Sequence, residues 1–171
     1  MRLRCGIAAA LTLAATSLAA QTSPPTPIFR YINIQPYGRI ELGGPFAQVS
    51  VLGAPISPGL YELVGPGGRA VQYADTKTIL IELSSANLVR AFYFHYLPGV
   101  QSFAQREAEY VESLGVPERF KYDSAGSHVL RSRWRDPKTT FELIEITKSD
   151  TARIFSVLRD RHPTAAVKPG S

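Results

Sequence analysis

Few side chains in this sequence have the types and spacing that catalysis or metal binding requires. The three histidines, His95, His128 and His162, are not separated by the spacing of paired metal ligands. The only cysteine is Cys5, and no serine lies in a Gly-x-Ser-x-Gly elbow. The glycine cluster at residues 65–68 lacks the Lys and Ser or Thr of a phosphate-binding loop. The sequence therefore predicts no catalytic residues, no metal site and no cofactor.

Aromatic and basic side chains form the second chemical group, and their chemistry is binding. All five residues from 92 to 96 carry rings, in the order Phe-Tyr-Phe-His-Tyr, and arginines recur at every second position from 131 to 135. Rings on a sheet surface anchor protein or glycan partners, and arginines pair with acidic groups. The predicted binding residues are Tyr73, Tyr93, His95, Arg131, Arg133 and Trp134.

The same residues have a plainer interpretation. Phe92 and Phe94 would face the core while Tyr93 and His95 cover the other face of the sheet. The arginines, on the face opposite Trp134, would then belong to an ordinary ion-paired surface. The sequence leaves both interpretations open.

The charge balance argues against a nucleic-acid partner. The formal net charge is +5, or +3 once Arg2 and Arg4 are removed with the segment described next. Acidic residues are interspersed with the basic ones along the chain, whereas a nucleic-acid-binding protein concentrates Lys and Arg on one face. We expect no nucleic-acid partner.

Residues 1–20 are predicted to be a signal peptide. Arg2 and Arg4 precede an apolar run from Ile7 to Leu18, and small residues follow it, with the best cleavage position after Ala19. The run is shorter than the roughly 20 residues that span a bilayer, so no membrane span is expected after cleavage. Cys5 lies ahead of the apolar run and cannot carry a lipid anchor. The expected location is the periplasm or the exterior of the cell.

The clearest element signals lie in the second half of the chain. Ser102 and Gln105 form a possible capping box for a helix from 102 to 114, which Gly115 and Pro117 would end. An alternating run at 128–135 and another at 140–145 flank an Asp-Pro-Lys-Thr turn. Pairing residue 135 with residue 140 across this hairpin would place Trp134 beside Phe141.

Weaker signals complete the predicted domain, residues 28–162, which follows a proline-rich linker at 21–27. Strands are expected at 28–34, at 39–42, through Tyr73 and at 88–97, with a turn at 75–78 before a return strand. A short helix is expected between Pro45 and Gly53, and a C-terminal helix at about 150–161, capped by Ser149 or Asp150. Residues 163–171 are expected to be an unstructured tail.

Comparing the chain with itself predicts an internal repeat. Leu52-Gly53-Ala54-Pro55 and Leu114-Gly115-Val116-Pro117 each follow a Phe-Ala-Gln and precede an aromatic and a turn, at an offset of roughly 60 residues. Repeat one would cover about 40–97 and repeat two about 98–148. The predicted fold class is α+β: an antiparallel sheet with helices on one face, built from two diverged helix-hairpin repeats.

These phrases, with Ile40-Glu41-Leu42-Gly43, resemble the tandem repeat of the β-lactamase-inhibitor proteins and of small outer-membrane assembly lipoproteins. The resemblance covers about Ile40 to Ile146. It implies the repeat fold and a general role in protein binding. This chain departs from the pattern because it has no lipid-accepting cysteine after the signal and no disulfide pair.

The leading functional hypothesis is an exported, non-catalytic module that binds an envelope or secreted protein through an open sheet face. One alternative is a small secreted hydrolase with His95 or His128 as its base, gathered with other polar groups in a pocket. Another is a small-molecule or glycan binder, which predicts a closed, aromatic-lined cavity.

We predict that the exported protein begins at Ala20, because the small residues at 17 and 19 suit a signal peptidase. Intact-mass measurement of protein recovered from the periplasm or medium tests this. A recovered chain that still begins at Met1 contradicts the prediction.

Overall fold

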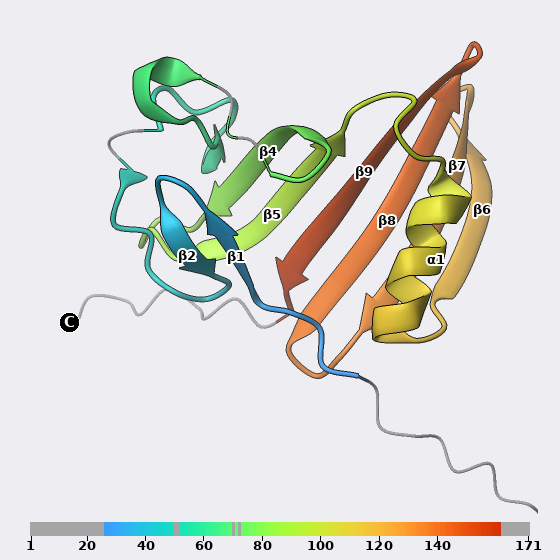
Figure 1. Ribbon diagram of the computed structural model, residues 1–171, viewed down its shortest axis with the longest axis horizontal. Helices are drawn as coiled ribbons and strands as arrows, with labels where there is room; N and C mark the ends of the chain where they lie inside the picture. The colour runs from blue at the N-terminus through green and yellow to red at the C-terminus, as the bar shows by residue number, and fades with distance from the viewer. Residues whose placement is uncertain (1–25, 50–51, 70, 72, 162–171) are drawn as a thin grey trace, which may run out of the picture.

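The computed structural model describes residues 26–49, 52–69, 71 and 73–161, and this part of the chain is mainly β structure (Figure 1). Its elements are β1 (Tyr31–Ile34), β2 (Gly38–Glu41), β3 (Leu60–Glu62), a 3₁₀ turn at Pro66–Gly68, β4 (Thr76–Leu83), β5 (Val89–Tyr96), α1 (Phe103–Leu114), β6 (Glu118–Ser124), β7 (Ser127–Arg135), β8 (Thr139–Lys148) and β9 (Thr151–Asp160).

The strands form a seven-stranded antiparallel sheet and a separate two-stranded one. The order in the large sheet is β3-β4-β5-β9-β8-β7-β6, and β1 pairs with β2. The chain thus builds β3 to β5, crosses through α1, and returns as a four-stranded meander. The last strand, β9, lies between β5 and β8 in the middle of the sheet.

The prediction of an α+β fold with two helix-hairpin repeats is wrong. Within the described residues α1 is the one α-helix. The segment expected to be the first helix contains turns in its described part, while residues 50 and 51 lie outside the description. Strand β4 pairs with β3 on one side and β5 on the other, not with a strand through Tyr73. The two halves share short phrases but not an architecture.

The predicted C-terminal helix is also wrong, because residues 151–160 form β9. Ser149 and Asp150 have φ values of +46° and +63°, and Lys148 pairs with Thr151 across them. Two consecutive positive φ values are what a type I′ hairpin turn requires. The residues interpreted as a helix cap therefore form a tight turn. The predicted tail and His162 lie outside the described residues.

Two local predictions are confirmed. Ser102 caps α1 and forms the capping box with Gln105, and Gly115 follows the helix with a φ of +82°. The β7–β8 hairpin has the predicted register, with Trp134 opposite Phe141 and Arg133 opposite Glu142. Strand β6, which lies between α1 and β7 in the sequence, was not predicted.

Among the described residues, other elements cover one face of the large sheet and leave the opposite face largely uncovered. In Figure 1, α1 and the β1–β2 hairpin lie in front of the sheet. We call this side of the sheet the helix face. The buried core lies between the sheet and the elements that cover it, and it includes Ile32 from β1, Phe92 from β5 and Phe141 from β8. Alternate residues point to the opposite side, which we call the open face; it carries Tyr93, His95, Arg131, Arg133, Glu142 and Arg159.

Buried Asp136 ties the N-terminal segment to the β7–β8 turn. One carboxylate oxygen accepts the backbone N–H of Ile28 at 2.8 Å. The other accepts those of Lys138 at 2.8 Å and Thr139 at 2.6 Å. Asp136 is 7% exposed, so these amides have little access to water as a substitute.

We predict that Asp136→Ala lowers the free energy of unfolding by about 3 kcal/mol, because it leaves buried donors without an acceptor. Urea unfolding measures the change, with the exposed helix variant Glu112→Ala as control. A loss no larger than that of the control, within about 0.5 kcal/mol, contradicts this role.

Candidate ligand-binding pocket

A cavity of about 410 Å³ lies on the helix face, between α1 and the sheet. Polar groups from three elements enter it: Asp75 just before β4, Arg106 of α1 and Ser156 of β9. Six aromatic rings surround them: Phe29, Tyr73, Phe94, Tyr96, Tyr110 and Phe141. The volume lies within the range of small-molecule sites, about 300–1,000 Å³.

The periodicities of strand and helix bring these side chains together. Phe94 and Tyr96 are two residues apart on β5, so both point to the helix face. Arg106 and Tyr110 are four apart on α1 and lie one above the other. Ser156 of β9 is paired with Phe94 of β5, and its small side chain leaves room beside that ring.

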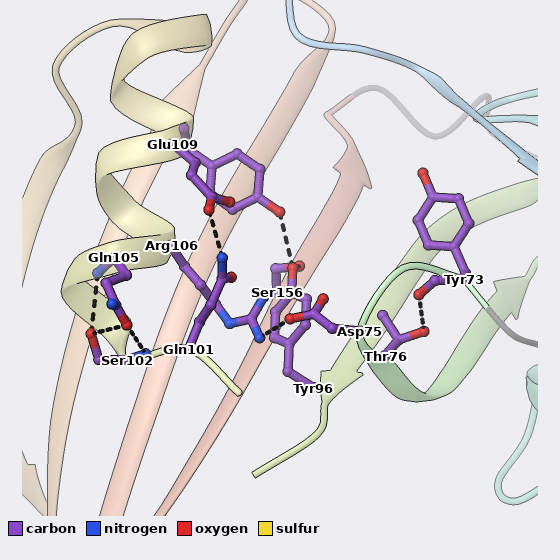
Figure 2. Close-up of polar contacts among 11 residues, drawn as sticks. Tyr73, Asp75, Thr76, Tyr96, Gln101, Ser102, Gln105, Arg106, Glu109 and Ser156 are labelled. Carbon is purple, nitrogen blue, oxygen red and sulfur yellow. Dashed lines mark hydrogen bonds and ion pairs between the residues drawn. The ribbon is translucent and has the colours of Figure 1, made fainter. Parts of the chain in front are cut away.

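A part-buried ion pair crosses the pocket (Figure 2). Arg106 is 3% exposed, and its Nη2 donates a short hydrogen bond to the Asp75 carboxylate. Its guanidinium carbon lies 3.7 Å from the centre of the Tyr96 ring. The hydrogen bond from Arg106 holds the pKa of Asp75 below its ordinary value. The Arg106 Nε atom is buried and has no hydrogen-bond partner in the described structure.

Three hydroxyl groups form a chain beside the ion pair. The Tyr96 hydroxyl lies 3.0 Å from that of Tyr110 and 2.8 Å from the Ser156 Oγ. Burial raises the pKa of both tyrosines. Both phenols therefore remain protonated at neutral pH and serve as hydrogen-bond donors and acceptors.

The segment between β5 and α1 forms one side of the pocket. Gln101 donates through Nε2 to the Glu109 carboxylate at 2.6 Å, which holds this segment against the helix (Figure 2). Val100 also lines the pocket and is 54% exposed. Val100 therefore lies at the mouth, between the cavity and solvent.

The chemistry of these groups favours binding over proton transfer. Asp75 is stabilised as an anion by its ion pair, and the two phenols are stabilised as neutral groups. A general acid or base works best with a pKa near the operating pH, and both shifts move away from it. The arrangement is suited to hold an apolar molecule and to orient it through a few polar contacts.

Two of the six predicted binding residues lie on the helix face. Tyr73 lines the pocket, with its ring centre 5.8 Å from that of Phe94. Trp134 is 4% exposed, and its indole donates to the Gly115 carbonyl at 2.7 Å. It packs against Tyr110 and Phe141, so it supports the pocket from behind.

The other four lie on the open face. The Tyr93 hydroxyl donates to Glu82 at 2.6 Å, and the His95 ring stacks on Phe155 with centres 5.6 Å apart. Arg131 and Arg133 both contact Glu142. The sheet therefore separates the predicted residues into two groups that cannot contact one ligand together.

Sequence reasoning missed the polar centre of the pocket, which consists of Asp75, Tyr96, Arg106, Tyr110 and Ser156. On α1 the apolar residues Ala104 and Ala108 are exposed. The inner face instead contains Phe103, Arg106, Tyr110 and Leu114. A charged residue at helical spacing between apolar ones was the available signal.

The remaining histidine in the described part of the chain lies away from the pocket. His128, on β7, is exposed and its Nδ1 contacts Asp123. Within the described ranges, no three His, Cys, Asp or Glu side chains are close enough together to hold a metal ion. None of the described helices is long and apolar enough to cross a membrane.

Comparison with known proteins gives no match: no family model, curated protein or solved structure is significantly similar to this chain. The resemblance to the β-lactamase-inhibitor proteins therefore stays a prediction.

The ion pair predicts a specific pH dependence of stability. Folding lowers the pKa of Asp75. Its contribution to the free energy of unfolding is therefore fully present above its unfolded pKa of about 3.9, and this contribution is lost as the pH falls through the folded pKa. We expect Asp75→Asn to lose about 2 kcal/mol at neutral pH, since the Asp75 side chain is 24% exposed. Urea unfolding between pH 7 and pH 2 should show the two proteins converging below about pH 4. Parallel curves over this range contradict the assignment.

Proposed function

We propose that this chain is an exported, non-catalytic binding protein whose pocket holds an apolar or aromatic small molecule. The observation that carries the proposal is the cavity of about 410 Å³ lined by six aromatic rings and crossed by the Arg106–Asp75 pair. Rings supply most of the contact area for such a ligand, and the polar groups fix its orientation.

The polar lining of the pocket supports a ligand with an oxygen acceptor. Arg106 lines the cavity, and its guanidinium is a hydrogen-bond donor with no acceptor capacity. The tyrosine hydroxyl chain offers further polar contacts along the same wall. The proposed ligand therefore has an apolar body and one or a few oxygen atoms.

The pocket favours one of the alternatives from the sequence over the leading hypothesis. The small-molecule alternative predicts a closed, aromatic-lined cavity; the cavity of this chain is lined by aromatic rings but is partly open to solvent. The aromatic pocket does not support a hydrolase based on His95 or His128, because these residues lie on opposite faces of the sheet and neither lines it. His95 lines a separate cavity of about 850 Å³ with Tyr96, Ser102 and Glu145, so that alternative stays a prediction. Binding of an envelope protein through the open face stays a prediction, as does export.

The fluorescent dye 1-anilinonaphthalene-8-sulfonate, which has aromatic rings and an oxygen-rich group, can test the proposal. We expect the dye to bind with enhanced emission. Val100→Trp would narrow the pocket mouth and weaken binding at least tenfold, or about 1.4 kcal/mol. Dye emission, excited at its own absorption band, gives both affinities.

Val116→Trp is the matched control, because Val116 is 82% exposed and does not line the pocket. It should bind the dye as the unmodified protein does. Equal affinity of the Val100→Trp and Val116→Trp proteins, or no dye binding by the unmodified protein, contradicts the proposed site.

A further inference from the structure

A groove of about 210 Å³ lies on the open face, on the other side of the sheet from the aromatic pocket. Strands β7, β8 and β9 form it side by side. Four of its lining residues are arginines and one is a carboxylate: Arg131, Arg133, Arg135, Arg159 and Glu142, with Thr140 and Val157 completing the wall.

Strand register places two of these arginines on either side of a hydroxyl. Arg135 of β7 is paired with Thr140 of β8, and Thr140 is paired with Arg159 of β9. Neighbouring strands lie about 4.8 Å apart, so the two arginine backbones are separated by about 10 Å. Guanidinium groups on side chains of this length can both reach a small group held above Thr140.

The next row across the sheet holds the carboxylate. Glu142, between Arg133 and Val157 in the ladder, is 14% exposed in its side chain. Its Oε1 accepts from the Arg133 Nε at 2.6 Å and from Arg131. The Arg131 Nε is buried and has no partner in the described structure. Glu142 therefore holds the two inner arginines of the groove, Arg131 and Arg133, with one carboxylate.

The outer two arginines have looser contacts. The Arg135 Nη1 lies 3.8 Å from Glu118, and the Arg159 Nη2 lies 3.8 Å from Glu82. Both distances exceed a hydrogen bond. Arg159 also donates to the Tyr93 hydroxyl at 2.7 Å. Their side chains are 43% and 54% exposed, so much of each guanidinium faces solvent.

We propose that this groove binds a phosphate or sulfate group, either as a free ion or as part of a lipid headgroup. The planar fork of arginine matches the oxygens of such groups and donates two hydrogen bonds at once. Arg135 and Arg159 contact the oxyanion from two sides, and the Thr140 hydroxyl donates from below. The site is independent of the aromatic pocket, because the sheet separates them.

Titration with inorganic phosphate at low ionic strength, followed by amide NMR spectra, tests the free ion. Low salt matters because exposed charges are screened beyond about 10 Å at 0.1 M. We expect the largest shift changes at Arg135, Thr140 and Arg159. The double variant Arg135→Gln/Arg159→Gln should bind phosphate at least tenfold more weakly.

Two controls separate a built site from general charge attraction. Arg153→Gln removes an exposed arginine from the same strand and face as Arg159 but outside the groove, and it should leave phosphate affinity unchanged. Val100 does not line the groove, so Val100→Trp should also bind phosphate normally. Failure of the dye experiment therefore does not contradict the phosphate site, and failure of the phosphate experiment does not contradict the aromatic pocket.

Co-sedimentation with phosphatidylglycerol vesicles, compared with phosphatidylcholine vesicles, tests the headgroup. Binding in either arm that is lost in the double variant supports the proposal and identifies the source of the oxyanion. The proposal is overturned if neither probe binds, if the double variant binds as well as the unmodified protein, or if Arg153→Gln weakens binding equally.

Discussion

The pairing of β5 with β9 is the constraint on which the rest of the structure depends. It joins the three strands of the first half to the meander of the second, through contacts such as Phe94 with Ser156 and Ala91 with Arg159. These partners are more than 60 residues apart in the sequence, so closing the chain carries an entropic cost that local contacts do not repay. The core on the helix face, with Phe92 against Leu158, offsets it.

The same pairing creates both candidate sites, because a strand sends alternate side chains to opposite faces. On the helix face β9 contributes Ser156 to the pocket, and on the open face it contributes Arg159 to the groove. The pocket also needs α1, which the Arg106–Asp75 pair connects to the start of β4. A buried ion pair contributes little net stability relative to apolar packing. Its effect here is to position α1 and to keep polar atoms inside an aromatic cavity.

Local signals predicted part of this structure well. The capping box at Ser102 and the Asp-Pro-Lys-Thr turn act within a few residues, so α1 and the β7–β8 register followed from the sequence. Of the pocket, only Tyr73 was among the predicted binding residues, with Trp134 supporting it. Arg106 was missed because the role of a helix residue depends on the residues that it contacts, and its partner Asp75 is distant in sequence.

By itself, then, the sequence determined the helix from 103 to 114, the hairpin that follows it and the alternation of Phe94 with Tyr93 and His95. Tertiary structure decided whether residues 151–160 form a helix or a strand. Ile154, Val157 and Leu158 have helical spacing, yet a central strand also accommodates them, with Val157 on the open face and Leu158 on the helix face. Pairing with β5 and β8 selected the strand. Only that choice assembled the pocket and the arginine groove, since each takes side chains from strands that the sequence does not place together.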